Sequence, residues 1–197
     1  MNIKFWGLVT MKKSTVIIVL LIGIFAFSFG GLATARSLSG PEFDQPMLIT
    51  SIGQSADGQM VRVLAQRAGL SFTYDALAGA AAVAECRTLA LVVGGSSKGL
   101  GAAGINPEQE EQRAQDLIAN AKNAGAKIMV LHVGGEARRG ELTDRFIRLA
   151  APHANYMIVV ADGNQDGIFS QIAGENIPVD YPGSVSEAGA FLKAAFR

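Results

Sequence analysis

The sequence predicts an α/β fold, a three-layer sandwich over a mainly parallel sheet of five to six strands with flavodoxin-like or Rossmann-like connections. Three observations predict it. Short apolar runs alternate along the chain with segments of helical periodicity. The most apolar run, residues 89–93, has no polar alternation, which is typical of a strand buried on both faces. A glycine-rich segment, residues 94–104, follows it at once. We expect the strand order 2-1-3-4-5, with a sixth strand at an edge.

The elements before this central strand are expected in the following order. Residues 47–52 form a first strand, and residues 53–57 form its loop. The next helix ends at Gly69, because glycine readily adopts the left-handed conformation of a helix end. Residues 71–74 form a short second strand, and the alanine-rich residues 77–85 form a helix.

The elements after the central strand alternate in the same way. Asn106 and Pro107 begin the clearest helix, since Asn accepts hydrogen bonds at a helix start and Pro suits the first helical position. That helix ends at Gly125. The others follow in chain order: strand 127–133, a helix that stops at Pro152, strand 156–160, a short helix through Ile168 and Ile172, edge strand 177–181, and a last helix capped by Ser184.

Residues 1–35 have the pattern of a secretory signal peptide. Lys12 and Lys13 precede an apolar stretch, residues 14–29, and residues 33–35 are Ala-Thr-Ala, a cleavage site of small residues. An uncleaved N-terminal anchor is the alternative. Both interpretations place the domain outside the cytoplasm, in the periplasm or secreted.

The remainder of the chain is expected to be a flexible leader, residues 36–46, and one α/β domain, residues 47–197. Three of the 17 basic residues and none of the 17 acidic ones lie in the first 35 residues, which leaves the remainder with a formal charge of −3. This charge argues against nucleic-acid binding, which needs a concentrated basic surface. The single cysteine, Cys86, can form no intramolecular disulfide and is expected to pack as a small apolar side chain.

Gly99, Gly101 and Gly104 match the G-x-G-x-x-G pattern of dinucleotide-binding loops. Residues 94–101 resemble the cofactor loop of short-chain dehydrogenases, a resemblance that implies glycines around a pyrophosphate. That family places the loop after its first strand, uses a Tyr-x-x-x-Lys pair and has an acid about 20 residues further on. This sequence lacks all three features, so no cofactor is predicted.

Gly95, Ser97 and Gly99 fit G-x-S-x-G, the turn that presents the nucleophile of α/β hydrolases. In that family an acid and then a histidine follow the serine. His132 lies inside a strand and His153 precedes the fifth strand, so neither stands where the base is expected. A hydrolase using Ser97, or a nucleotide-dependent enzyme using the loop from Gly99 to Gly104, is the alternative to a binding role.

The sequence predicts no metal site. Residues 162–167, Asp-Gly-Asn-Gln-Asp-Gly, match the first half of a calcium loop, but the bidentate acid that should follow is replaced by Ala173. A βα turn with Asp166 at the helix N-cap is favoured, and calcium between Asp162 and Asp166 is the alternative. His132 has no second His or Cys at metal-ligand spacing.

Residues 134–140, Gly-Gly-Glu-Ala-Arg-Arg-Gly, form a second glycine-rich loop. Arg138 and Arg139 precede a helix, where their charge opposes the helix dipole. A bound anion would explain them, because arginine pairs bidentately with carboxylate or phosphate. Pairing with Glu136 or Glu141 is an equal alternative.

Three segments, residues 49–55, 92–105 and 134–146, carry a resemblance to a known family. They resemble an uncharacterised family of exported bacterial α/β domains, a domain of unknown function. The resemblance covers residues 47–196, and it implies a secreted single domain. It assigns no catalytic residue.

We therefore expect an extracytoplasmic binding domain for a small anionic metabolite, serving a transporter or a sensor. The loops after the first, third and fourth strands would cradle the anion with backbone amides, and Lys98 and the two arginines would neutralise it. We expect the site at the switch between the first and third strands. The predicted ligand-binding residues are Gly53, Gln54, Ser55, Gly94, Gly95, Ser96, Ser97, Lys98, Gly134, Gly135, Glu136, Arg138 and Arg139.

Overall fold

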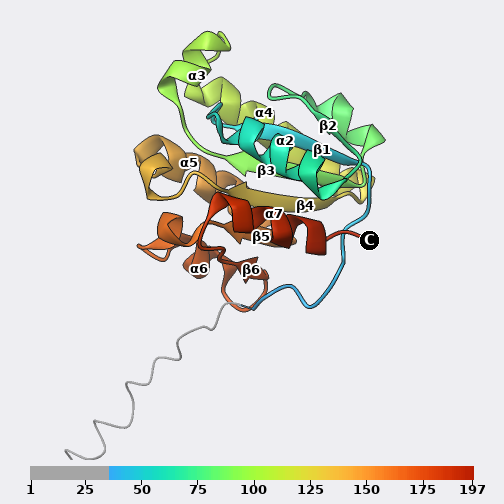
Figure 1. The fold of residues 1–197 in the computed structure, drawn as a ribbon. Helices are drawn as coiled ribbons and strands as arrows, with labels where there is room; N and C mark the ends of the chain where they lie inside the picture. The colour runs from blue at the N-terminus through green and yellow to red at the C-terminus, as the bar shows by residue number, and fades with distance from the viewer. Residues whose placement is uncertain (1–35) are drawn as a thin grey trace, which may run out of the picture. The chain divides into compact units, whose positions relative to one another are not determined.

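A computed structural model describes residues 36–197, and the expected signal segment, residues 1–35, lies outside the described residues. Within residues 36–197 six strands form one all-parallel sheet in the order β2-β1-β3-β4-β5-β6 (Figure 1). The flavodoxin-like order and the edge position of the sixth strand are confirmed. The strands are β1 (Met47–Ile52), β2 (Phe72–Tyr74), β3 (Thr88–Val93), β4 (Lys127–His132), β5 (Tyr156–Val159) and β6 (Val179–Asp180).

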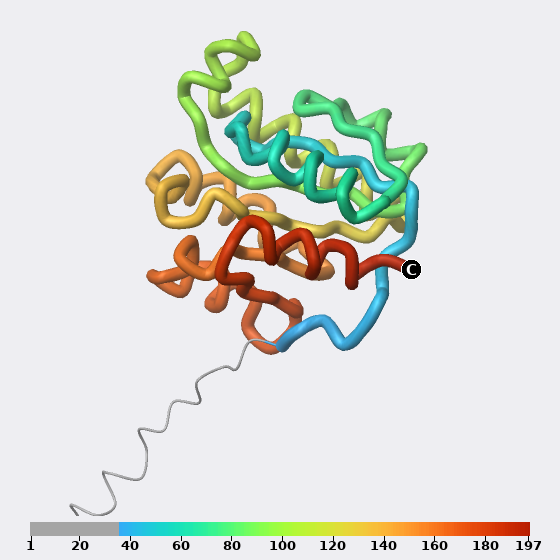
Figure 2. Tube along the Cα trace, viewed as in Figure 1, coloured from blue at the N-terminus to red at the C-terminus, as the bar shows by residue number. Residues whose placement is uncertain are grey.

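Helices cover both faces of the sheet, which confirms the three-layer sandwich (Figures 1 and 2). On one face, α2 (Asp57–Ala68) packs beside α7 (Val185–Ala194). The other face is covered by α4 (Pro107–Ala124), α5 (Glu141–Ala150), α6 (Ile168–Ala173) and the 3₁₀ helix η1 (Ala80–Glu85). The remaining helices are α3 (Ser97–Ala102), η2 (Glu136–Arg138), η3 (Ala151–His153) and η4 (Ala161–Asn164). No helix in the described part of the chain is both long and apolar enough to span a membrane.

The central strand is buried on both faces, as its composition predicts. All six residues of β3 are buried. Leu89 and Leu91 pack with the α4 and α5 side chains, while Ala90 and Val92 pack with those of α2 and α7. This division follows from the strand geometry, because successive side chains point to opposite faces. An apolar run without alternation is therefore what a doubly covered strand requires.

The predicted helix signals agree with the structure at their clearest positions. Asn106 accepts a hydrogen bond from the Gln109 N–H group at 2.8 Å, and the Gln109 side chain accepts one from the Asn106 N–H group at 2.9 Å. This reciprocal capping box begins α4. Gly69 and Gly125 end α2 and α4 in the left-handed region, with φ of 73° and 69°.

Three expected elements differ from the structure. The predicted α-helix over residues 77–85 is wrong, because residues 80–85 form a 3₁₀ helix in which only Val83 is buried, too little apolar surface to hold an α-helix. The predicted loop over residues 94–104 contains the short helix α3. The edge strand is two residues long rather than five: only Val179 and Asp180 pair with β5, and the preceding Pro178 has no N–H group to extend the ladder.

Residues 36–46 pass from β6 to the start of β1 (blue in Figure 2). The ring of Phe43 is buried, with its centroid 6.0 Å from that of Tyr156 and 5.9 Å from that of Phe196. Both the Glu42 and the Phe43 N–H groups donate to the carbonyl oxygen of Ala195. This leader segment therefore completes the apolar cluster on the α2 and α7 face of the sheet.

Candidate functional site

The loops after β1, β3 and β4 meet at one edge of the sheet, because these three strands are neighbours and parallel. An isolated bridge pairs Gln54 with Gly95 across the first two loops. The Ser55 N–H group donates to the Gly94 carbonyl oxygen at 3.1 Å, and the Ser96 N–H group donates to the Gly53 carbonyl oxygen at 2.8 Å. Backbone therefore fills the crevice between β1 and β3, the position at which we expected the ligand.

Other amides of the predicted cradle also donate to the protein itself. These bonds run from Gly53 to the Glu110 carboxylate (2.7 Å), from Gly94 to the Ile52 carbonyl oxygen (2.9 Å), and from Gly95 to the Thr143 hydroxyl (2.8 Å). Each of these amides stabilises a loop against a neighbouring element. A ligand would have to displace the protein acceptor before it could bind there.

A buried ion pair on α4 fixes the loop after β1. Glu110 is fully buried and accepts hydrogen bonds from the Gly53 N–H group and from Gln54 Nε2 at 3.0 Å. It also accepts from two nitrogens of Arg113, both at 2.8 Å. Arg113 in turn donates to Thr50 and to two carbonyl oxygens. This network holds Gln54 at φ 57°, in the left-handed region that non-glycine residues rarely adopt.

Asp57, the first residue of α2, lies buried between two glycines. A Cβ atom at Gly94 would stand 2.8 Å from Asp57 Oδ2, and a Cβ at Gly134 would stand 2.6 Å from it. The carboxylate accepts no hydrogen bond from residues 36–197, but its Oδ1 lies 3.4 Å from Arg138 Nε. The Arg138 side chain is 43% exposed, and within the described residues its terminal nitrogens make no hydrogen bond. The buried Asp57 carboxylate therefore holds Arg138 at Nε, while the two terminal nitrogens of this arginine stay available to a ligand.

In contrast, all three side-chain nitrogens of Arg139 donate hydrogen bonds to other residues of the protein. Its Nε donates to Asp144 at 2.8 Å, and its two terminal nitrogens bond both carboxylate oxygens of Asp166 at 2.9 Å and 2.7 Å. It also donates to the Gly163 carbonyl oxygen at 2.6 Å. These contacts tie the loop after β4 to the loop after β5. The bond from Arg139 is the main cause that lowers the pKa of Asp166 to about 2, and a bond from the Ile168 N–H group adds to it.

The ion pair between Arg139 and Asp166 predicts that the stability of the chain depends on pH. Asp166 has a lower pKa in the folded chain than in the unfolded one, so its contribution to stability is present above the unfolded pKa, about 3.9, and is lost as the pH falls toward 2. Its side chain is 54% exposed, so solvent screening keeps this contribution below about 1 kcal/mol. Asp166→Asn should therefore lower the melting temperature at neutral pH, and its difference from the unchanged chain should close between about pH 5 and pH 2. Glu175→Gln, at an exposed position in the same region, serves as the control. A difference independent of pH would contradict this role.

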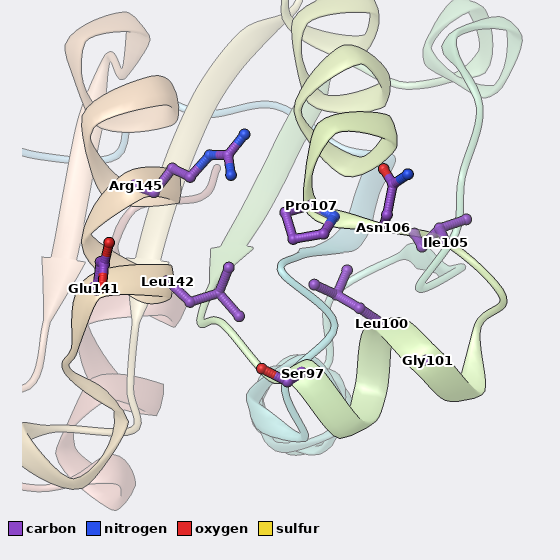
Figure 3. A pocket seen from close by; sticks show the side chains of 9 residues that line it. All are labelled: Ser97, Leu100, Gly101, Ile105, Asn106, Pro107, Glu141, Leu142 and Arg145. Atoms are coloured by element: carbon purple, nitrogen blue, oxygen red, sulfur yellow. The ribbon is translucent and has the colours of Figure 1, made fainter.

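Two cavities open beside these loops on the α5 side. The smaller, about 220 Å³ and here called the arginine cavity, is lined by Gly95, Ser97, Ala137, Arg138, Arg139, Gly140, Glu141, Leu142 and Thr143. The larger, about 570 Å³ and here called the leucine cavity, is lined by Ser97, Leu100, Gly101, Ile105, Asn106, Pro107, Glu141, Leu142 and Arg145 (Figure 3). The two cavities are neighbours, because Ser97, Glu141 and Leu142 line both.

Helix α5 begins at the arginine cavity without a side-chain cap. Its N-cap is Gly140, and the N–H groups of Glu141, Leu142 and Thr143 have no hydrogen-bond partner within the described residues. Such N–H groups, together with the partial positive charge of a helix start, favour an anion. The hydroxyl of Ser97 lines the same cavity.

The predicted ligand-binding residues fall into three groups. Those that line the arginine cavity are Gly95, Ser97, Arg138 and Arg139. Those in or near the closed loops are Gly53, Gln54, Ser55, Gly94, Ser96, Gly134 and Gly135. Lys98 and Glu136 are exposed and line neither cavity. The structure thus brings the two arginines together with Ser97, and it leaves Lys98 outside.

Sequence reasoning missed Asp57, Glu110 and Thr143, which position the loops. All three lie in the first turn of a helix, where acidic and hydroxyl side chains are common for local reasons. No local signal separates them from ordinary helix starts. Their partners lie on other strands and helices, so their roles emerge only from the fold.

Both histidine rings contact groups other than Ser97. His132 is fully buried, with Nδ1 2.9 Å from the Val93 carbonyl oxygen and Nε2 3.2 Å from that of Gly135. His153 Nδ1 lies 3.0 Å from Lys122 Nζ.

A family model described as "Domain of unknown function (DUF6305)" matches residues 44–196. The chain belongs to this family. The matched region of this DUF6305 domain includes every strand of the sheet and every helix from α2 to α7. No curated protein matches the chain, and no solved structure matches it. Membership in an uncharacterised family, expected from the sequence motifs, is confirmed.

Proposed function

We propose that this chain is an extracytoplasmic domain that binds a small anionic metabolite in the arginine cavity and serves a transporter or a sensor. One observation carries the proposal. Arg138 is held by the buried Asp57 carboxylate, yet its terminal nitrogens stay available beside a cavity that is also lined by Glu141, Leu142 and Thr143, the uncapped first turn of α5.

These donors suit the oxygen atoms of a carboxylate or phosphate. A guanidinium forms short, charge-assisted hydrogen bonds to such oxygens, and its fixed planar shape allows two at once. The start of α5 adds N–H donors and the positive end of a helix dipole. The Ser97 hydroxyl, which can rotate, supplies one further donor or acceptor.

The site is held in shape before a ligand arrives. The bond from Gly95 to Thr143 joins the loop after β3 to the first turn of α5, and Arg139 anchors the loop after β4 through Asp144 and Asp166. Preorganised donors lose little conformational entropy on binding, which increases affinity. His132 contacts carbonyl oxygens through both ring nitrogens and His153 contacts Lys122 through Nδ1, and neither contacts Ser97, which favours a binding role for Ser97 over a nucleophilic one.

The location outside the cytoplasm is supported by residues 1–35, whose lysines, apolar stretch and small-residue site have the pattern of an export signal. Cell fractionation with mass spectrometry of the N-terminus tests this part. Recovery of the chain in the cytoplasm would contradict it.

Calorimetric titration of the full-length chain tests the binding site. With acetate and inorganic phosphate as probes, we expect saturable binding to one site and a higher melting temperature, because a ligand specific for the folded state stabilises it. Arg138→Ala should weaken binding at least about tenfold, the loss expected for a charge-assisted hydrogen bond. Undiminished binding would reject the site.

Two controls separate binding from folding. Arg148→Ala removes the same charge from an exposed position nearer the other end of α5, and it should leave affinity unchanged. Arg138→Ala also leaves the Asp57 carboxylate buried without its cation, which is destabilising. The double variant Asp57→Asn, Arg138→Ala removes that unpaired charge, so it should recover stability while binding remains lost.

A further inference from the structure

The walls of the leucine cavity are mainly apolar. In Figure 3 the side chain of Leu142, on α5, points toward those of Leu100, on α3, and Pro107, at the start of α4. The volume of about 570 Å³ lies in the range of sites that hold small organic ligands, about 300–1,000 Å³. The arginine cavity, at about 220 Å³, has room for a head group and little more.

Two of the polar side chains around the leucine cavity, those of Arg145 and Asn106, already have partners in the protein. Arg145 is paired with Glu111 and, at 3.0 Å, with Glu108. The Asn106 side chain accepts the Gln109 N–H group as the cap of α4. A charged or strongly polar ligand group placed here would compete with these bonds, whereas an apolar group would gain from leaving water.

The two cavities adjoin each other, since Ser97, Glu141 and Leu142 line both. A ligand with its anionic head at Arg138 would therefore extend its remaining atoms past Leu142 into the leucine cavity. From this geometry we infer that the ligand is a carboxylate with an aliphatic body, the body occupying the leucine cavity. The inference rests on the proposed function, which supplies the head-group site.

A series of straight-chain carboxylates tests the inference on the full-length chain. Acetate, butyrate and hexanoate have the same head group and differ in apolar length. Each buried methylene should tighten binding about threefold to fourfold. Equal affinities for acetate and hexanoate would overturn the inference and leave the anion site standing. Absence of binding by every anion would instead reject the proposed function.

The cavity itself is tested by filling it. A Cβ atom at Gly101, which lines the leucine cavity, meets no atom within 4 Å, so Gly101→Phe adds bulk there without a backbone clash. This variant should bind hexanoate no more tightly than acetate, with acetate affinity unchanged. Ala102→Phe, at the next and exposed position of α3, lines neither cavity and should keep the dependence on length. A full chain-length effect in Gly101→Phe would overturn the assignment of the cavity.

A neutral probe tests whether the two cavities act together. Hexanol has the apolar body of hexanoate without its charge, so it should bind at least about tenfold more weakly if Arg138 holds the head group. Equal binding of hexanol and hexanoate would overturn the inference, because the apolar cavity would then act without the anion site.

Discussion

Glu110→Ala is expected to lower the free energy of unfolding by about 3–5 kcal/mol, the usual cost of removing one partner of a buried ion pair. The remaining partner, Arg113, is only 15% exposed and would lose both bonds to the carboxylate. The Gly53 N–H group would lose its acceptor at 2.7 Å, and Gln54 would lose a bond that holds it in the left-handed region. Chemical denaturation of the full-length chain measures the loss.

Glu108→Ala is the matched control, because Glu108 lies in the first turn of the same helix and also pairs with an arginine. Its side chain is 67% exposed, so solvent screens the pair and the variant should destabilise the fold far less than Glu110→Ala does. If the two variants lost similar free energies of unfolding, the burial of Glu110 would not matter for stability. That result would contradict the role of Glu110 in holding the loop after β1.

Gly99→Ala is expected to destabilise the fold by about 3 kcal/mol or more, at the upper end of the usual cost of overpacking. A Cβ atom at Gly99 would lie 2.0 Å from the Gln54 carbonyl oxygen, which belongs to the backbone and cannot rotate away. Either α3 or the β1 loop would have to move. The bridge between Gln54 and Gly95 would then be distorted.

Gly101→Ala provides the comparison within the same short helix. A Cβ atom there meets nothing within 4 Å, so alanine should stabilise α3 by up to about 1 kcal/mol through its higher helix propensity. Gly99→Ala is thus expected to lower the free energy of unfolding, and Gly101→Ala, two residues later, to raise it. If thermal denaturation gave the two variants equal melting temperatures, the close approach of α3 to the β1 loop would be disproved.

Most of the fold follows from local patterns in the sequence. The parallel sheet, its order and the limits of α2 and α4 depend on apolar periodicity and on residues such as Asn106, Gly69 and Gly125, which act within one turn of their own position. The predictions failed where the local signal was weak. In residues 80–85 only Val83 is buried, so the apolar pattern of a helix is weak there. Residues 97–102 contain two glycines and were therefore predicted as a loop, although they form α3, which the Ser96 hydroxyl caps.

The candidate site was predictable only in part, because its residues act on partners far along the chain. In the sequence Arg138 and Arg139 are adjacent, and nothing local shows which of them would bind a ligand. The fold gives them different partners. Arg139 forms hydrogen bonds with Asp166, 27 residues later, through its terminal nitrogens. Arg138 contacts Asp57 through Nε only, so its terminal nitrogens stay available.

By itself, then, the sequence determined a parallel α/β sandwich and the edge of the sheet where its glycine-rich loops gather. The tertiary structure alone decided which amides bond to Glu110 and Thr143 and which, at the start of α5, stay unpaired beside a cavity. The physical reason is that secondary structure follows from short-range periodicity and capping, whereas a buried polar group takes whichever partner the packing of distant elements brings within about 3 Å.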